Sequence, residues 1–327
     1  MSDPFGRPPE TTDLPDPAVQ LMTEEPEAMG PPATDLPDFS GPLTPSGHLR
    51  RRQLISRLAE VGQTTAALLA VAVLGIVVYS VAERGASVLS LGFLTKDPPL
   101  LAGSAGGGIA PAIVGTAVIM ALATAIAMPI GILTALYLTE FAGRWSGRAF
   151  RLILDLLNGL PTIVVGLFVF GLLVVGHHQS GFAGSFALAI IMLPLIARAT
   201  QEVLLLVPVG LREAADALGV SHWRTVRGVV LPTARGGILT ATVLAVARGA
   251  GETAPLILLS SIFANTVSAN PFGQALPNIP VYIFTASESA EANGFSRAWG
   301  AAFVLLVFIL LASIVGRTLS RRSTLSR

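Results

Sequence analysis

The sequence contains no cysteine among its 327 residues, and only 13% of the residues are charged. The absence of cysteine excludes disulfide bonds, thiol chemistry and cysteine-ligated metal sites. A soluble domain typically has about a quarter of its residues charged. Half that fraction, together with 52% apolar residues and a mean hydropathy of +0.69, excludes an ordinary cytosolic domain. The net charge of +1 gives no indication of nucleic-acid binding.

Two long stretches lack charge altogether. Residues 98–139 and 156–197 contain no Asp, Glu, Lys or Arg. One transmembrane helix needs about 20 apolar residues, so each stretch is long enough for up to two spans. The chain therefore predicts an all-α, polytopic membrane protein with six transmembrane helices, at 64–82, 113–137, 152–175, 182–197, 237–262 and 298–315. Pro129, Pro161 and Pro255 lie inside three of these spans and predict kinks.

The first 47 residues differ from the rest of the chain. They contain eleven prolines and nine acidic residues but only one basic residue, without apolar periodicity. Such a composition buries too little apolar surface to offset the entropy of ordering. We expect residues 1–47 to form a disordered, acidic, Pro-rich tail and residues 48–327 to form the transmembrane domain.

The distribution of basic residues predicts the orientation. One set of connections carries 17 Arg and Lys residues, and the other set carries three. The basic set comprises the N-terminus, residues 138–151, residues 198–236 and the C-terminus. Because cytoplasmic connections are enriched in Arg and Lys, both termini and the 198–236 segment are predicted to be cytoplasmic.

The cytoplasmic segment 207–232 predicts two short helices. Residues 211–218 have high helix propensity, and Gly219 suits the left-handed conformation that closes a helix. Ser221 is a candidate cap for a second helix at 222–230, which is expected to stop before Pro232. Arg212, Glu213 and Asp216 are expected to present charge around the small side chains of Ala214 and Ala215. The pattern fits either a knob that docks into a partner's groove or a hairpin lying on the membrane surface.

The same segment carries a family motif. It contains, in order, Glu213-Ala214-Ala215, Gly219, Val229, Leu231 and Pro232. This arrangement resembles the EAA loop of prokaryotic ABC importer permeases, in which Ile stands where this chain has Val229. The resemblance implies the type I ABC importer permease fold and a coupling helix that docks onto an ATP-hydrolysing subunit. The residues it assigns to coupling are Glu213, Ala214, Ala215, Gly219, Leu231 and Pro232.

The chain lacks the parts of a nucleotide site or an active site. Its single lysine, Lys96, follows no glycine-rich loop, so the chain contains no Walker A motif. It also contains no activated nucleophile that we can identify, and His177 and His178 have no third ligand for a metal. We therefore expect a permease that is not an enzyme and holds neither metal nor cofactor, with ATP bound by another polypeptide.

A charged pair interrupts the fifth predicted span. Arg248 and Glu252 are four residues apart, which places them on one face of a helix. An arginine within the bilayer costs about 3 to 10 kcal/mol unless it is compensated. Gly249 and Gly251 leave room for a helix or a solute. The pair is either a structural ion pair or part of an anion pathway, in which the arginine supplies charge and a fork of donors.

Two further groups lie near predicted span ends. Arg198 and Glu202 have the same four-residue spacing, and Arg198 either extends to the interface or contributes to a pathway. Asp155 and Asn158 precede Pro161 and suit interfacial packing or an inner gate.

Several further stretches indicate which subfamily of these permeases the chain resembles. Residues 93–98, 107–116, 129–133, 158–162 and 247–256 are similar to the PstA-type permeases of phosphate importers. In that subfamily the matching Arg and Glu are implicated in phosphate passage. The resemblance therefore implies a pathway through Arg248 and Glu252, with Arg198 as a third candidate. It also implies a prokaryotic cell membrane and four kinds of partner: an ATP-binding subunit dimer, a second, PstC-like permease, an extracytoplasmic phosphate-binding protein and membrane lipid.

Two other functions stay open at this point. A permease for sulfate or molybdate would use the same arginine, and only the subfamily stretches favour phosphate. An ion-coupled secondary carrier could use the Arg248–Glu252 pair as a relay, although the two halves of the sequence show no inverted repeat.

Overall fold

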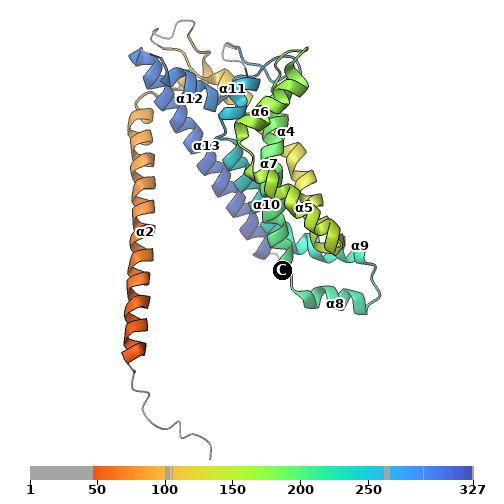
Figure 1. Cartoon of the computed structure of the whole chain (residues 1–327). Helices are drawn as coiled ribbons and strands as arrows, with labels where there is room; N and C mark the ends of the chain where they lie inside the picture. Colours follow the sequence, from red (N-terminus) through yellow and green to blue (C-terminus); the bar gives the residue numbers. More distant parts are fainter. Residues whose placement is uncertain (1–46, 100–103, 105, 261–265, 290, 326–327) are drawn as a thin grey trace, which may run out of the picture. The chain divides into compact units, whose positions relative to one another are not determined.

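The computed structural model describes residues 47–99, 104, 106–260, 266–289 and 291–325. The predicted tail lies almost entirely outside these residues. The chain divides into two compact units, Met1–Leu69 and Ala70–Arg327. All regular elements of the described residues are helical (Figure 1), which confirms the predicted all-α class.

The described residues form twelve α-helices and three short π-helical turns. The α-helices are α2 Gly47–Ala86, α3 Leu91–Thr95, α4 Ala110–Leu136, α5 Arg144–Gly159, α6 Thr162–Val169, α7 Gly181–Leu205, α8 Val209–Ala217, α9 His222–Thr225, α10 Leu231–Gly249, α11 Ala254–Leu259, α12 Ile279–Ser287 and α13 Ala292–Leu325. Three single π turns adjoin them: η2 Tyr137–Phe141, η3 Phe170–Val174 and η4 Val226–Val230.

Five helices of the described residues are long and apolar enough to cross a membrane. They are Arg51–Ala86, Ala110–Phe141, Gly181–Leu205, His222–Gly249 and Ala292–Thr318. A sixth span exists if Arg144–Gly159 and Thr162–Val174 are counted together, although the two parts are bent by 97°. The predicted six-span architecture is therefore retained.

The third predicted span, 152–175, is not one kinked helix. α5 ends at Gly159, Leu160 is extended with ψ 134°, and α6 starts after Pro161. Proline has no amide hydrogen to donate, and its ring disfavours the helical conformation at the preceding residue. The prediction of a kink at Pro161 underestimated this effect, because the preceding Gly159 offers little resistance to a full break.

The fourth predicted span continues past its predicted end. α7 runs without interruption to Leu205, and so through Arg198, with Pro194 in its interior. Its first turn is capped by Ser180, whose hydroxyl accepts a hydrogen bond of 3.2 Å from the Ala183 amide.

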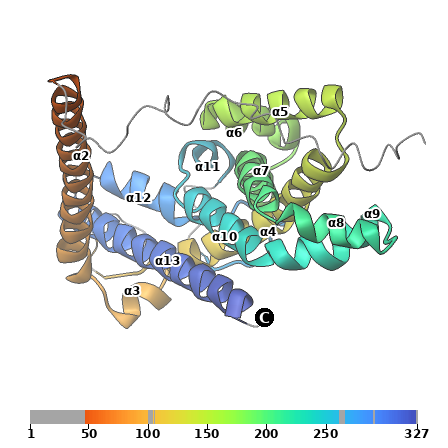
Figure 2. The same cartoon turned by 90° about the horizontal axis from the view of Figure 1, so that it is seen from below.

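The second unit is built around α4, α7 and α10. α4 packs along α7, and α10 packs against both α7 and α13. Seen along the bundle, α5 and α6 lie on the opposite side of α7 from α13 (Figure 2). Small residues permit this close approach: a Cβ on Gly131 would lie 2.9 Å from Ile196 Cγ2.

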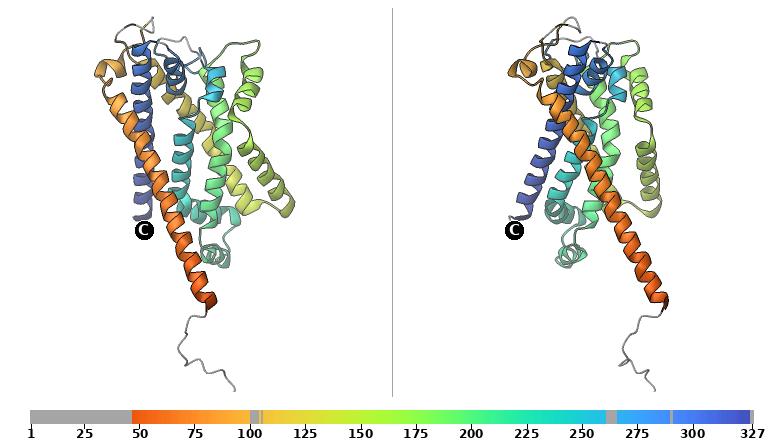
Figure 3. Two further views of the ribbon diagram at one scale, coloured as in Figure 1. Left: turned by 60° about the vertical axis from the view of Figure 1, so that its left-hand side comes forward. Right: turned by 90° about the vertical axis from the view of Figure 1, so that its left-hand side faces the viewer.

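The two ends of the second unit carry different elements. α11 and α12 lie at one end, and α8 and α9 lie at the other, which is also the end where α13 finishes (Figures 1 and 3). α8 and α9 adjoin η4, which together with the neighbouring ends of α4, α7 and α10 forms a buried apolar cluster. Its members are Ala135, Leu136, Leu204, Val207, Val226, Val230, Ala234 and Ile238.

The second short helix of the loop does not stop before Pro232. α9, η4 and α10 form one continuous helical run from His222 to Gly249. Pro232 lies in the first turn of α10, directly after the π turn of η4. The wider π turn accommodates a residue that cannot donate to the helix ladder, so the run continues where the sequence predicted a stop.

Candidate functional site

The predicted fifth span is broken at the charged pair. α10 ends at Gly249, residues 250–253 are not helical, and α11 begins at Ala254. The Gly251 and Glu252 amides donate hydrogen bonds of 3.1 Å to the Arg248 and Gly249 carbonyls, which turns the chain out of the helix. Gly249 and Gly251 weaken the helix, and Pro255 cannot continue it but suits the first turn of α11. The prediction of one continuous helix across 237–262 is wrong for this reason.

Arg248 and Glu252 nevertheless remain close together. Arg248 Nε lies 4.0 Å from Glu252 Oε1, at the outer limit of an ion pair. The Arg248 side chain is 63% exposed, whereas that of Glu252 is 17% exposed. A loose, exposed pair contributes little to stability. The geometry therefore leaves the guanidinium group able to accept another anion while the carboxylate is held against the protein.

The position of Arg248 along the helix differs from the prediction. Arg248 lies in the last turn of α10, not in the middle of a span. With a rise of 1.5 Å per residue it stands about 25 Å along the helix from Leu231. A cation in the last turn interacts favourably with the negative end of the helix dipole.

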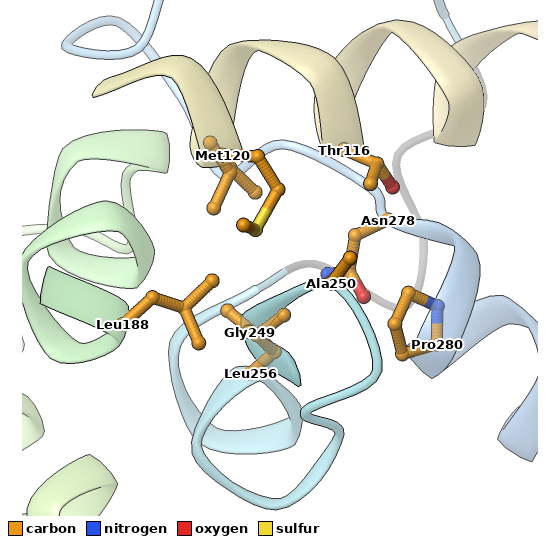
Figure 4. A pocket seen from close by; sticks show the side chains of 9 residues that line it. Thr116, Met120, Leu188, Gly249, Ala250, Leu256, Asn278 and Pro280 are labelled. Carbon is orange, nitrogen blue, oxygen red and sulfur yellow. The ribbon is translucent and has the colours of Figure 1, made fainter. Parts of the chain in front are cut away.

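A small cavity lies beneath the break. It measures about 10 Å³, which is space for about one water molecule. Its wall is formed by Thr116, Ile119, Met120, Leu188, Gly249, Ala250, Leu256, Asn278 and Pro280 (Figure 4). The room that Gly249 leaves is taken up by packing, since a Cβ there would lie 3.0 Å from Met192 Sδ.

The polar groups of this cavity are already engaged. Asn278 donates to Ser260 Oγ at 2.7 Å and accepts from the Val281 amide at 3.0 Å. Thr116 Oγ1 accepts from the Ile279 amide at 2.9 Å. These bonds hold the start of α12 against α4, and the cavity lacks the volume to bind an anion such as phosphate.

Arg198 pairs with a different carboxylate from the one its spacing suggested. Its Nη2 donates to Asp155 Oδ1 and, at 3.2 Å, to the Arg151 carbonyl, both on α5. Glu202 is exposed on α7. Arg198 therefore ties α7 to α5, away from Glu202 and from the Arg248–Glu252 pair. The bend between α5 and α6 sets the direction of α5 and hence the position of Asp155.

The coupling segment forms the predicted helical hairpin. α8 spans Val209–Ala217, and Gly219 has a positive φ of 69° as its closing residue. The Gly219 amide donates to Asp216 at 2.9 Å, and the Val220 amide donates to Ala215 at 3.1 Å, which satisfies the last carbonyls of α8. Ser221 occupies the N-cap position of α9, but its side chain makes no capping hydrogen bond.

The motif residues divide between the outside and the inside of this hairpin. Glu213 and Ala214 are exposed, whereas Ala215 is buried. Leu231 packs against the apolar cluster below the hairpin, and Pro232 follows it in the first turn of α10. The exposed part of the motif is therefore available to a partner, whereas the buried part holds the hairpin in place.

Arg212 does not present its charge to solvent as the sequence predicted. Its Nη2 donates to Glu140 Oε1 at 3.0 Å, and the Glu140 side chain is only 5% exposed. No sequence motif singled out Glu140. The available signal was its place at the end of the uncharged stretch 98–139, as the first charge after 42 residues.

A second buried charge lies near α12. Arg297 of α13 donates to the Ser104 carbonyl at 2.8 Å and is 7% exposed. Burial raises the pKa of the neighbouring Tyr282 hydroxyl, and the charge of Arg297 opposes that rise. Among the described residues, no group of three or more His, Asp or Glu side chains is placed to hold a metal ion.

Comparison with known proteins gives consistent matches. Residues 127–324 match the family described as the binding-protein-dependent transport system inner membrane component. The chain is 38% identical over 247 residues to the phosphate transport system permease protein PstA of Yersinia pestis, covering 74% of this chain and 82% of that protein. It is 38% identical to PstA 1 of Mycobacterium tuberculosis (67% and 73% covered) and 36% identical to PstA of Xylella fastidiosa (86% and 98% covered).

Solved structures support the fold. A chain of a bacterial alginate ABC transporter, in complex with an alginate pentasaccharide-bound periplasmic protein, matches with a TM-score of 0.58 and 16% identity. The match covers 83% of this chain and 96% of that chain. At this level of identity the likeness establishes the arrangement of helices only.

Proposed function

This chain belongs to the binding-protein-dependent transport system permeases and, within them, to the PstA-type phosphate permeases, and from this premise we propose that it forms half of the translocation pathway of an ATP-driven importer of inorganic phosphate. The observation that carries the proposal is the 38% identity to a phosphate permease over 82% of that protein's length. The same matches favour phosphate over sulfate or molybdate, because the relatives are phosphate permeases.

The pathway is proposed to pass along the exposed side of Arg248. The cavity beneath the break measures only about 10 Å³. Arg248, by contrast, is 63% exposed and only loosely paired. An anion that meets this guanidinium group therefore travels along a face of the subunit, and a second permease is needed to enclose that face. Glu252 limits how tightly the anion binds, since its carboxylate competes for the same charge.

The partners follow from the two ends of the second unit. We assign the α8–α9 hairpin, with exposed Glu213 and Ala214, to the docking surface for a dimeric ATP-binding subunit. The opposite end, with α11 and α12, faces an extracytoplasmic phosphate-binding protein. ATP is bound by the ATPase subunit, and this chain itself holds no cofactor.

The proposed location is the cell membrane of a prokaryote, with both termini in the cytoplasm. The basis is the excess of 17 to three basic residues on the side that carries the hairpin. Residues 1–47 are proposed to be an acidic cytoplasmic tail of the transmembrane domain.

Replacement of Arg248 tests the pathway. In proteoliposomes with the ATPase, the second permease and the binding protein, we expect Arg248→Gln to reduce phosphate uptake at least tenfold, because glutamine keeps hydrogen bonding but loses the positive charge. Arg248→Lys, which keeps the charge without the fork, is expected to retain more uptake than Arg248→Gln.

The control removes both charges. Arg248→Gln removes a charge and also leaves the Glu252 carboxylate without its partner, so the single variant changes two things at once. The double variant Arg248→Gln/Glu252→Gln restores neutrality and is expected to assemble normally but still fail in uptake. Recovery of phosphate uptake in the double variant would show that the pair is structural only.

A further inference from the structure

Glu140 forms the centre of a polar cluster between the end of α4 and the coupling hairpin. Its carboxylate accepts from Arg212 Nη2 at 3.0 Å, and His222 Nε2 lies 3.7 Å from its second oxygen. The same His222 nitrogen lies 3.1 Å from the Glu140 carbonyl oxygen. One residue of η2 thus contacts both helices of the hairpin, α8 through Arg212 and α9 through His222.

Arg212 also joins the end of α7 to this cluster. It donates to the Val207 carbonyl at 2.8 Å through Nη1 and to the Leu204 carbonyl at 3.0 Å through Nη2. These carbonyls belong to the last turn of α7 and the residues after it, where the helix ladder leaves acceptors unused. The guanidinium fork therefore fixes three segments relative to one another, which a lysine could not do.

Aromatic contacts extend the same junction. The Phe141 ring, next to Glu140, packs edge-on against the His222 ring with centroids 5.1 Å apart. Its centroid lies 6.3 Å from that of Trp223. We call Glu140, Phe141, Arg212, His222 and Trp223 the η2 clasp.

The clasp lies at one end of a long helical run whose other end lines the cavity. α4 and η2 form one helical run from Ala110 to Phe141. One end of this run carries Glu140, and the other end lines the cavity beneath the broken span with Thr116 and Met120. A displacement of the hairpin is therefore applied to the same helix that packs beside the Arg248–Glu252 break.

The chemistry of the clasp favours a specific role over a purely stabilising one. A buried ion pair contributes little net stability compared with apolar packing, because desolvation of the two charges offsets their attraction. The apolar cluster below the hairpin already holds these helix ends together. A buried pair in addition specifies one arrangement of the hairpin relative to α4.

We propose that Glu140 is a positioning residue that fixes the coupling hairpin to α4 through Arg212 and His222, so that movement of a docked ATPase is passed to α4 and not lost at the membrane surface. This proposal rests on the proposed function, because it needs an ATPase on the hairpin.

Glu140→Gln tests the proposal in the full transporter. We expect the ATPase to co-purify at the wild-type ratio and hydrolyse ATP at its basal rate. Stimulation of hydrolysis by the phosphate-loaded binding protein and phosphate uptake are both expected to fall at least tenfold. Glu202→Gln is the matched control, since Glu202 is exposed near the same end of α7, and it is expected to behave like wild type.

A chemical cross-link in place of the Glu140–Arg212 ion pair distinguishes a loss of coupling from a loss of folding. Because the chain contains no cysteine, Glu140→Cys/Arg212→Cys can be bridged by a bifunctional thiol reagent in a complex whose other subunits have no reactive cysteine. We expect uptake to be low before bridging and to rise several-fold after it. That rise supports the clasp even if Glu140→Gln assembles poorly.

Two results would overturn the proposal. One is full stimulation and uptake in Glu140→Gln; the other is failure of the bridged variant to regain uptake that the unbridged variant has lost. Failure of the wild-type complex to import phosphate would instead reject the proposed function.

Discussion

Arg212, Arg198 and Arg248 carry the same charge but have different surroundings. Their side chains are 21%, 35% and 63% exposed, respectively. Arg212 is held by a buried carboxylate and two carbonyls, Arg198 ties two helices, and Arg248 meets its partner only at 4.0 Å. Their exposure therefore increases in that order, and the most exposed of the three, Arg248, is the one proposed to meet a transient anion.

The sequence predicted only the local part of these contacts. The Arg248–Glu252 proximity was predictable because both residues lie within one turn of chain. The Arg198–Asp155 and Arg212–Glu140 pairs join residues 43 and 72 positions apart, and both depend on how helices pack. Spacing alone suggested Glu202 for Arg198, and it suggested solvent for Arg212.

Gly115 provides a test of packing at a single residue. It lies against the Pro277 carbonyl, so a Cβ there has no space without movement of backbone. We expect Gly115→Ala to destabilise the protein by about 1 to 3 kcal/mol, as overpacking typically does. In detergent the midpoint of thermal unfolding is expected to fall by several degrees.

Gly75→Ala is the matched control, because no atom lies within 4 Å of a Cβ built at Gly75 in α2. Alanine is the better helix former, so this variant is expected to unfold at the wild-type temperature or slightly above it. Equal midpoints for Gly115→Ala and wild type would contradict the close contact.

At the scale of elements, the sequence predicted helix existence better than helix ends. The hairpin of α8 and α9 was predicted from propensity and from Gly219, because these signals are local. The continuation of α10 through Pro232 and the break at 250–253 were not. In each case the outcome depends on a neighbouring feature: the π turn that accommodates Pro232, and the glycines that release the chain before Pro255.

Closure of the hairpin depends on the left-handed conformation of Gly219. A Cβ at φ 69° costs about 1 to 2 kcal/mol, which corresponds to roughly a 5- to 30-fold change in a conformational equilibrium. We expect Gly219→Ala to reduce the amount of ATPase that co-purifies by a factor in this range when the ATPase is limiting.

Gly210→Ala controls for the added methyl group, since Gly210 lies in the same hairpin with ordinary backbone angles and open space around it. It is expected to bind ATPase like wild type. If both variants bind equally well, closure at Gly219 is not required for docking.

At the scale of the whole molecule, the composition predicted the class and the number of spans, and the motif offsets predicted the family. The resemblance implied the residues of a pathway but not its course, because in the proposed importer one subunit supplies only one side of the route. The small cavity and the exposed Arg248 are the two observations behind the proposal that the route runs along the surface of the subunit. The sequence of one chain does not show how a second chain completes such a surface.

The proposed orientation gives a direct test. The chain has no cysteine, so single cysteines report their own side of the membrane. We expect a membrane-impermeant maleimide to label His177→Cys in intact spheroplasts and Leu218→Cys only in inside-out vesicles. Both side chains are exposed, Leu218 by 82%. The experiment uses cells that do not produce the ATPase, so that a docked ATPase does not shield Leu218→Cys. The opposite labelling pattern would contradict the proposed orientation.

The π turns affect how the helices tolerate a change in length. A π turn closes over one residue more than an α turn, so it absorbs an insertion without rotating the helix on either side. One residue gained inside α4 would instead rotate the remainder by about 100° and turn its buried face outward. η4 follows the α8–α9 hairpin directly, and η2 contacts it through Glu140. A change of one residue in length at these turns would therefore alter the hairpin while the helices around Arg248 keep their register.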